Sequence, residues 1–479
     1  MAILGLVALA FSLAQTSVAP ALGDIAASLH TSTHDVTWAL TGYLVSAAVL
    51  TPVFGRLGDM FGKRRLLVIS LALFAVGGAL AAVGGSLALV VAGRVVMGVG
   101  GGIFPLCFGI IRDEFPQRRR AGAVGLISAT AGIGGGLGLL MGGLLVDHAS
   151  YRWIFWMGTI MAVVAAVAAQ FMLPESPVRT PGRIDVTGTV LLGAGIIAPL
   201  IAISQAASWG WTSGRTLGLI AAGLAVLTVF VLVERRTPEP LVDMAVLARR
   251  PVLMTNLATL LLGFGMFGVF LLVPQLVETP EASGYGFGGD ATRAGLLMLP
   301  GCLMMLVAGP LSGRLTTRFG GKMPMALGGL VTATGMALLA AEHGSQGAVL
   351  GFTMVVFVGI GLAFAAMPNL IVDNVEAAKT GEATGVNALV RSVGSSIGSQ
   401  VIAGILAHSV TARHPLPTEH AYTVSFLVAG VGALVAAAVT VLIPRPRSHD
   451  HVPVLEEVGA AAVLPEPALA ADEDGKSHT

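Results

Sequence analysis

The chain has 479 residues, of which 55% are hydrophobic and 11% are charged. A soluble domain carries roughly 25% charged residues, so this composition excludes a water-soluble fold. The formal net charge of +1 excludes a nucleic-acid-binding protein. Apolar runs of about 20 residues recur along the chain, and each can cross a hydrocarbon core of roughly 30 Å. We therefore expect an all-α polytopic membrane protein, with the lipid bilayer as one partner.

In chain order, the apolar runs predict fourteen spanning helices. They cover residues 2–22, 34–54, 66–84, 87–110, 122–146, 152–173, 187–207, 215–235, 251–274, 293–312, 323–342, 346–371, 383–408 and 420–443. The first run also resembles a signal peptide, but no Lys or Arg precedes Arg56, so a spanning helix is the better interpretation. Residues 444–479 are polar, interrupted by Pro and then acidic, which predicts a disordered tail.

The loops differ in charge on the two sides of the membrane. Most of the 27 Lys and Arg residues fall in the loops of one side, whereas the opposite loops hold Arg152, Arg215, Arg293 and Arg413. Cytoplasmic loops are the ones enriched in Lys and Arg. An even number of helices then places both termini in the cytoplasm, and we expect the protein in the plasma membrane.

A glycine-rich basic motif occurs twice, at residues 52–64 and 310–322. Each copy is predicted to be a turn between two spanning helices on the cytoplasmic side. We therefore divide the chain into a six-helix bundle (1–173), two additional helices (174–236), a second six-helix bundle (237–443) and the tail (444–479). The halves are parallel repeats, and such repeats place a binding site between themselves, which indicates a carrier.

The first motif copy resembles the loop signature of the major facilitator superfamily through Gly55, Arg56, Leu57, Asp59, Gly62, Lys63, Arg64 and Arg65. Residues 38–43, 93–100, 151–156 and 381–394 resemble its fourteen-helix drug–proton antiporter branch. The resemblance implies a secondary transporter that exports amphipathic or cationic organic compounds in exchange for protons. Two positions depart from the branch pattern: Ala14 replaces a common aspartate, and Leu139 replaces a proline.

We expect no cofactor and no metal site, since Cys107 and Cys302 lie in apolar segments at a spacing that suggests no metal ligation. We also expect a monomer.

The resemblance implies that the motif is a latch that holds the cytoplasmic face closed, with Arg56 and Asp59 as partners. The latch residues are Gly55, Arg56, Asp59, Gly62, Lys63 and Arg64, and in the second copy Gly313, Arg314 and Gly320. Thr317 replaces the aspartate in the second copy, so the first copy should be the stronger gate. The alternative is a solvated basic loop that only sets the topology.

Proton coupling has four candidates in the sequence. Arg94 lies inside the fourth predicted helix, where a charge costs about 2.5–3.5 kcal/mol and needs a partner. The resemblance implies a coupling role for Arg94, and a purely structural arginine is the alternative. Asp35, Asp147 and His148 lie at helix ends. An acid at a helix end is more often a cap than a proton relay.

Polar and soft side chains within the spans are candidates for the cavity wall: Gln15, Tyr43, Met97, Asn256, Gln275, Asn387 and Arg391. Gly134, Gly138, Gly142 and Gly143 crowd the fifth helix. The resemblance implies a flexible interface there that controls which face opens, whereas close helix packing alone is the alternative.

Other functions remain as alternatives. A proton-coupled importer, or an exporter dedicated to one endogenous metabolite, would share these features. A membrane-embedded enzyme or sensor is a remote alternative, because the spans show no His/Asp/Glu cluster and the chain shows no extra soluble domain.

Overall fold

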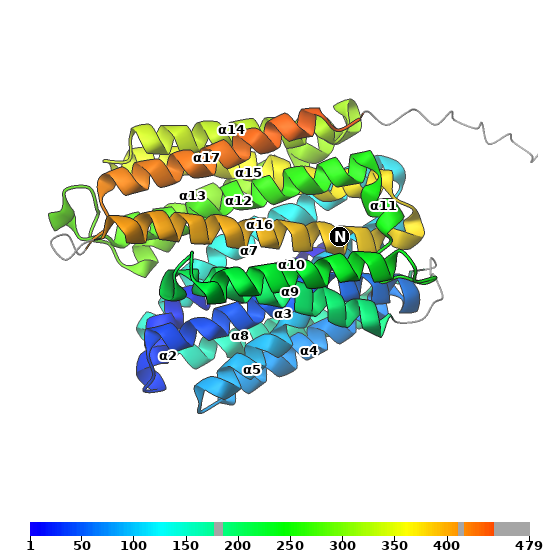
Figure 1. The fold of residues 1–479 in the computed structure, drawn as a ribbon, viewed down its shortest axis with the longest axis horizontal. Coiled ribbons are helices and arrows are strands. Elements are labelled where there is room, and N and C mark those ends of the chain that lie inside the picture. The colour runs from blue at the N-terminus through cyan, green and yellow to red at the C-terminus, as the bar shows by residue number, and fades with distance from the viewer. Residues whose placement is uncertain (177–184, 411–415, 445–479) are drawn as a thin grey trace, which may run out of the picture. The chain divides into compact units, whose positions relative to one another are not determined.

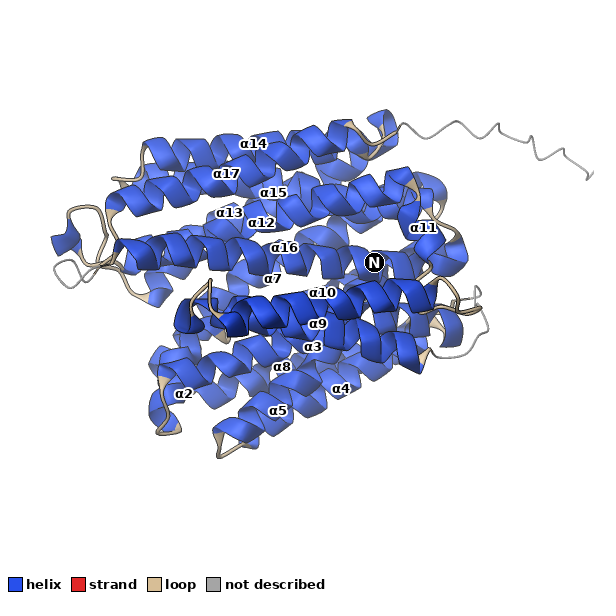
Figure 2. Ribbon diagram, in the orientation of Figure 1, coloured by secondary structure: helices blue, strands red, loops and turns tan. Residues whose placement is uncertain are grey.

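The computed structural model describes residues 1–176, 185–410 and 416–444. All regular secondary structure in these ranges is helical (Figure 2). Fourteen helical segments in the described chain are long and apolar enough to cross a membrane, which confirms the predicted fold class. The predicted tail lies outside the described residues from position 445 onward, as do Arg179, Arg183 and Arg413.

Six spans form the first bundle, and Figure 1 shows most of their helices. They are α1 (Ala2–Thr16) continued by α2 (Leu22–Ser28), α3 (Thr33–Phe61), α4 (Lys63–Val83), α5 (Leu87–Met97) continued by α6 (Ile103–Glu114), α7 (Gln117–His148) and α8 (Tyr151–Met172). The first span changes to a 3-10 turn at Pro20, since proline lacks an amide and fixes φ. The fourth does so at Gly98–Gly102, because glycine weakens a helix.

The remaining spans follow in chain order. They are α9 (Val186–Trp209), α10 (Gly214–Glu234), α12 (Arg250–Glu278), α13 (Ala291–Phe319), α14 (Lys322–Ala341), α15 (Gln346–Asn374), α16 (Thr380–Ser409) and α17 (Glu419–Val441). The short helix α11 (Met244–Ala248) lies between α10 and α12 and does not span. The six spans from α12 to α17 form the second bundle, with an apolar core of its own.

The two bundles meet along two helix pairs, α3 with α16 and α7 with α13. The additional helix α9 packs on both α3 and α16, and α10 packs on α9. Leu192 of α9, Val53 of α3 and Val386 of α16 belong to one apolar cluster. The first additional helix therefore covers the seam between the bundles.

Both motif copies are mostly helical, which corrects the expectation of a turn. Helix α3 continues to Phe61 and α4 begins at Lys63, so the reversal occurs at Gly62 alone, with φ +106°. The second reversal includes Gly320, with φ +82°. Glycine adopts such positive φ values without a steric penalty. We call the end of the bundles where Gly62 and Gly320 lie the motif end.

Helix capping differs between the two ends. At the end opposite the motif, each spanning helix that begins there has a cap from its own N-cap side chain: Ser32, Ser86, Ser150, Ser213, Asp290, Ser345 and Thr418. At the motif end, α9 is capped by Asp185, but α4, α7, α12, α14 and α16 have no such cap of their own. A helix N-terminus leaves amides without partners, so such helices need acceptors from elsewhere.

Candidate functional site

The carboxylate of Asp59, near the end of α3, supplies the missing acceptor for α16. Its Oδ2 accepts a hydrogen bond from the backbone amide of Glu382 at 3.0 Å. The side chain of Asp59 is buried, and a negative charge is favoured at a helix N-terminus. A residue of the first bundle thus completes a helix of the second.

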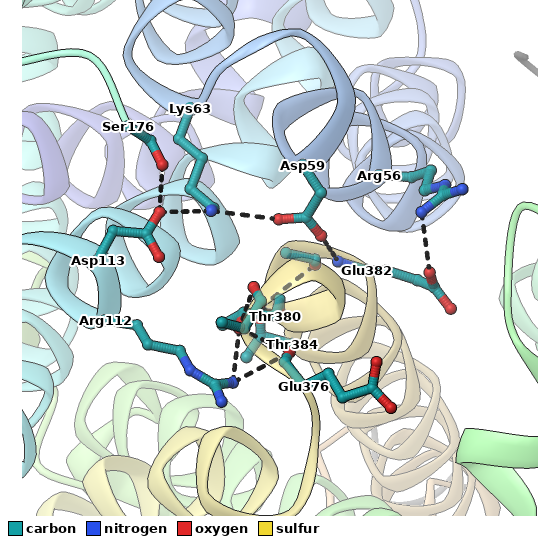
Figure 3. Close-up of polar contacts among 12 residues, drawn as sticks. Arg56, Asp59, Lys63, Arg112, Asp113, Ser176, Glu376, Thr380, Glu382 and Thr384 are labelled. Carbon is teal, nitrogen blue, oxygen red and sulfur yellow. Dashed lines mark hydrogen bonds and ion pairs between the residues drawn. The ribbon is translucent and has the colours of Figure 1, made fainter. Parts of the chain in front are cut away.

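Lys63 neutralises this carboxylate inside the first bundle (Figure 3). Its Nζ lies 3.6 Å from Asp59 Oδ1 and 2.5 Å from Asp113 Oδ2. The hydroxyl of Ser176 donates to the same oxygen of Asp113. The Lys63, Asp59 and Asp113 side chains are almost completely buried. Removing one partner of such a group leaves an uncompensated buried charge, which costs about 3–5 kcal/mol.

Arg56 makes a second charged contact between the bundles, with Glu382 (Figure 3). The distance from Arg56 Nη1 to Glu382 Oε2 is 3.7 Å. The structure therefore corrects the expected pairing of Arg56 with Asp59, because Arg56 pairs with Glu382 of α16 and Asp59 pairs with Lys63 of α4. The other oxygen of Glu382 accepts the amide of Asp243 at 2.6 Å.

Asp243 lies between α10 and α11 and bonds Lys379 Nζ at 2.6 Å. Partial burial tends to raise the pKa of Asp243, but hydrogen bonds from Lys379 and from the amides of Val246 and Ala245 outweigh it and hold this pKa below its ordinary value. The segment after the additional helices is thus tied to the start of α16.

Glycines let α3 and α16 touch backbone to backbone. A Cβ atom on Gly55 would lie 2.2 Å from the carbonyl oxygen of Gly381, and one on Gly381 would lie 2.4 Å from that of Gly55. One turn further along, a Cβ on Gly385 would lie 2.8 Å from Pro52 Cα. Any larger side chain would separate the two helices here.

Arg112, at the end of α6, reaches across to the first residue of α16 and to the segment before it. It donates to Thr380 Oγ1 at 2.7 Å, to the carbonyl of Val375 at 2.7 Å and to that of Glu376 at 3.2 Å (Figure 3). We call the group Arg56, Asp59, Lys63, Arg112, Asp113 and Glu382 the latch network.

The second motif copy forms no equivalent network among the described residues. Arg314 and Thr317 are exposed, and the Thr317 hydroxyl donates to the carbonyl of Arg314 on its own helix. Lys322 donates to the carbonyls of Val441 and Ile443, at the end of α17 in the same bundle. The two copies therefore differ in their contacts, and the stronger gating by the first copy stays a prediction.

Glycines of α7 also hold the other pair of helices together. A Cβ on Gly125 would lie 2.4 Å from the carbonyl oxygen of Gly309 on α13. At the far end of α7, a Cβ on Gly143 would lie 3.2 Å from Thr292 Oγ1. Small residues permit such close approach between membrane helices, so α7 and α13 touch along most of their length.

The other predicted glycines of α7 face a different helix. Cβ atoms on Gly134, Gly138 and Gly142 would each lie within 2.5 Å of atoms in α1 or in Ser17 just beyond it. These three glycines therefore serve packing within the first bundle, and Gly143 serves the contact between bundles.

A cavity of about 350 Å³ lies between the bundles. Its polar lining residues are Ser12, Gln15, Thr16, Tyr43, Thr51 and Arg94 from the first bundle and Arg391, Ser392, Ser395, Ser396 and Ser399 from the second. Its apolar lining includes Phe11, Phe104, Leu139, Leu200, Met266, Phe267, Phe270, Met305 and Phe364. On α3 the lining ends at Thr51, one turn before Gly55. The cavity thus stops where the helices of the latch meet.

A second hollow of about 380 Å³ is lined by Ser150, Arg152, Trp153, Trp156 and Ile160. All of these belong to α8 or its N-cap, so this hollow involves one bundle only. It lacks the two-sided wall that a pathway between the bundles requires.

The cavity contains three of the seven residues predicted for it, namely Gln15, Tyr43 and Arg391. Met97, Asn256, Gln275 and Asn387 lie outside its lining. Asn387 is buried and donates to Asn256 Oδ1 at 2.8 Å and to Thr259 Oγ1 at 3.0 Å. These amides bridge α12 and α16 within the second bundle.

Arg94 is completely buried and lines the cavity. Its Nε donates to the carbonyl of Ala39 at 3.2 Å, and its guanidinium lies 4.1 Å from the centre of the Tyr43 ring. Its Nη1 and Nη2 have no hydrogen-bond partner in the described chain. Arg94 is therefore only partly satisfied.

The remaining coupling candidates lie at the end opposite the motif. The Asp35 carboxylate accepts the Ser32 hydroxyl at 2.6 Å in the first turn of α3, where it is exposed. Asp147 accepts the Thr292 hydroxyl at 2.8 Å, which links α7 to α13. His148 is exposed and bonds the carbonyl of Leu144. None of them lines the cavity.

Three residues of the latch network were not predicted as site residues. Arg112 was noted in the sequence only as one of the many basic residues on its side of the membrane. Glu382 falls in a segment that resembles the antiporter branch. The resemblance drew attention to that segment but assigned no role to Glu382. Asp113 was hidden because it precedes a basic stretch, Arg118–Arg120, that dominates the loop.

Two six-helix bundles with two additional helices and a shared cavity define the class of protein, a membrane transporter. The sequence profile of the Major Facilitator Superfamily matches residues 4–399 and, in a second match, residues 287–471. The chain therefore belongs to this superfamily and is a transporter rather than an enzyme.

Curated relatives extend over most of the chain. The Tetracenomycin C resistance and export protein of Streptomyces glaucescens is 30% identical, over 92% of this chain and 90% of the relative. The Multidrug transporter protein MdtP of Bacillus subtilis (strain 168) is 26% identical, over 78% of this chain and 68% of the relative.

Solved structures support the fold. The human organic anion transporter MFSD10 (TETRAN) superposes with a TM-score of 0.63 at 15% identity, covering 92% of this chain and 98% of that one. The proton:xylose symporter XylE gives a TM-score of 0.62 at 15% identity, covering 92% and 95%. At such low identity these similarities concern the fold alone.

Proposed function

We propose that the chain exports amphipathic organic compounds from the cytoplasm across the plasma membrane, as a monomer and in exchange for protons. The observation that carries the proposal is the cavity of about 350 Å³, whose wall comes from both bundles and which ends at the latch network. The names of the two relatives, which concern resistance, export and multidrug transport, support an export direction.

In this proposal the motif end faces the cytoplasm, and the described state is closed on that side. Opening requires Asp59 to leave the first turn of α16 and Arg56 to leave Glu382. The amide of Glu382 then loses its acceptor and must bond water, since an unmade bond of a buried group costs about 1–3 kcal/mol. The latch thus stabilises the state that is closed at the motif end by a moderate amount. A carrier that alternates between two states requires such a small difference in free energy.

The experiment uses purified protein in liposomes with an amphipathic dye outside. An acidic lumen should accelerate dye uptake by the inside-out fraction, and a protonophore should abolish the acceleration. Dye movement that ignores the pH gradient would remove the proton-exchange part. No dye movement above that of protein-free liposomes, across a panel of amphipathic dyes, would sink the export proposal.

A second candidate is an exporter dedicated to one metabolite. The relative from Streptomyces glaucescens favours it, because that protein is named for resistance to a single compound and for its export. Competition distinguishes the two: many unrelated compounds should inhibit dye transport by a multidrug exporter, whereas a dedicated exporter should respond to close analogues of its cargo only.

A further inference from the structure

We propose that the cavity selects organic anions, namely compounds with an aromatic body and an acidic group that is ionised at neutral pH. This inference rests on the proposed export function and gives it a substrate class. It also replaces the cationic cargo that the resemblance to drug–proton antiporters implied.

The charge of the cavity wall is the first observation that supports an anionic cargo. Two arginines line it, Arg94 from α5 and Arg391 from α16, and no Asp or Glu occurs among the described residues of the lining. Each bundle therefore contributes one arginine to the lining of the same space. A cationic cargo would meet two like charges and no counter-charge, whereas an anion would neutralise charge from both bundles.

The unsatisfied donors of Arg94 are the second support. The residue is completely buried, yet Nη1 and Nη2 have no hydrogen-bond partner within the part of the chain that is described. A buried cation is costly unless it is paired and hydrogen-bonded. An acidic group in the cavity would supply the missing acceptors.

Arg391 is equally available. Its guanidinium lies 4.3 Å from the centre of the Phe364 ring, and no hydrogen bond or ion pair of its side chain occurs among the described residues. A guanidinium presents a planar fork of donors that matches a carboxylate or a sulfonate. Contact with the ring leaves those edge donors free.

The aromatic rings of the cavity wall also favour an anionic over a cationic cargo. A cavity can hold a cation without acids by placing it over aromatic rings. Here two of the wall's rings, those of Tyr43 and Phe364, are already covered by Arg94 and Arg391. The other rings of the wall remain for the body of the cargo: Phe11, Phe104, Phe267 and Phe270. The other wall residues, such as Phe267 and Met266, suit an apolar or aromatic body. An inside-negative membrane potential would also favour outward movement of an anion.

The test uses two fluorescent probes with the same ring and opposite permanent charge, pyrene-1-sulfonate and trimethyl(pyren-1-ylmethyl)ammonium. Binding of each to the purified full chain in an uncharged detergent is measured by fluorescence polarisation. We expect the sulfonate to bind roughly 30-fold or more tightly than the ammonium.

Substitutions at Arg391 then assign the preference. Arg391→Gln should weaken sulfonate binding by roughly 30-fold or more, and Arg391→Glu should reverse the order of the two probes. Arg391→Lys should keep the preference for the anion. Arg318→Gln is the matched control, because Arg318 also lies over an aromatic ring, that of Phe319, but does not line the cavity. Thermal unfolding confirms that each variant is folded.

Equal or tighter binding of the ammonium, sulfonate binding that survives Arg391→Gln unchanged, or no binding of either probe would overturn the inference. Its failure can be separated from that of the export proposal by adding liposome transport. Sulfonate that binds but does not cross would sink export and leave the anion site. Transport of neutral and cationic dyes at the same rate as the sulfonate would support the export proposal and contradict the selection of anions.

Discussion

Asp59 and Thr317 occupy equivalent positions in the two motif copies, and their surroundings differ accordingly. Asp59 is buried, paired with Lys63 and bonded to the first turn of α16. Thr317 is exposed and bonds only its own helix in the described structure. A carboxylate gains from a helix N-terminus and a nearby cation, and a hydroxyl gains little from either.

Asp59→Ala should therefore loosen the motif end. The variant loses a hydrogen bond to a charged acceptor, worth about 1.5–3 kcal/mol, so the open population should rise roughly ten-fold or more. The measurement is maleimide labelling of a cysteine placed at Ala383, which is 3% exposed in the first turn of α16. The native Cys107 and Cys302 are buried and give little background.

Thr317→Ala is the control for this variant and should leave the labelling rate unchanged. Equal labelling of the Asp59→Ala variant and the parent would show that Asp59 does not hold the motif end closed.

Lys63→Met tests the buried charge group. The change leaves Asp59 and Asp113 buried without their shared cation, which should lower the free energy of unfolding by about 3–5 kcal/mol. Arg314→Met, at an exposed cation of the second motif copy, should change it by no more than about 0.5 kcal/mol. Chemical unfolding in detergent compares the two. Similar losses in both variants would contradict the ion group described for Lys63.

At the scale of elements, the glycines of α7 lie on two faces of the helix, and each face contacts a different helix. One face lies on α13 of the other bundle, and the other lies on α1. The branch pattern has a proline at the position of Leu139, and here α7 runs without interruption from Gln117 to His148. Leu139 lines the cavity instead.

Gly125→Ala should impair transport, whereas Gly122→Ala should not. The new methyl group at position 125 would lie 2.4 Å from the carbonyl oxygen of Gly309, and the one at position 122 would have nothing within 4 Å. Overpacking of this kind costs about 1–3 kcal/mol. Dye efflux per molecule of protein is the measurement, and an equal rate in the two variants would contradict a close α7–α13 contact.

The additional helix α9 contributes to the site as well as to the seam. Leu200 of α9 lines the cavity, whereas Val190 of the same helix is 61% exposed. Leu200→Trp should raise the KM for the cargo roughly ten-fold by filling part of the cavity, and Val190→Trp should have no such effect. An unchanged KM in the Leu200→Trp variant would place α9 outside the pathway.

Sequence reasoning predicted the elements well because a spanning helix is a local property. About 20 apolar residues between charged loops suffice to predict each span. The contacts of the latch could not be predicted in the same way. Asp59 and Glu382 lie far apart in the chain, and nothing in the spacing of either motif says which helix N-terminus lacks a cap.

The residues that line the cavity could not all be predicted from the sequence either. Gln15 and Arg391 face it, whereas Asn387 satisfies its amide with Asn256 and Thr259 inside the second bundle. Both kinds of residue look alike in sequence, as polar side chains in apolar helices. Whether such a residue lines the cavity or links two helices depends on the direction of its side chain and on the partner that it contacts.

At the scale of the whole molecule, the two ends of the bundles are built differently. Helices that begin at the end opposite the motif are capped by their own residues. At the motif end, α16 takes its acceptor from the other bundle. Separation of the bundles at the motif end therefore breaks a helix cap, whereas separation at the other end does not. The motif end should be the one that the latch network controls.

The most direct test of this account measures the distance between the bundles at the motif end. Spin labels at Phe61 and Phe319, which are exposed and equivalent in the two motif copies, report it by pulsed electron paramagnetic resonance after Cys107 and Cys302 are replaced by alanine. We predict a short and a long population, with the long one enriched by Asp59→Ala and unchanged by Thr317→Ala. A single distance that neither substitution alters would contradict a carrier gated by this latch.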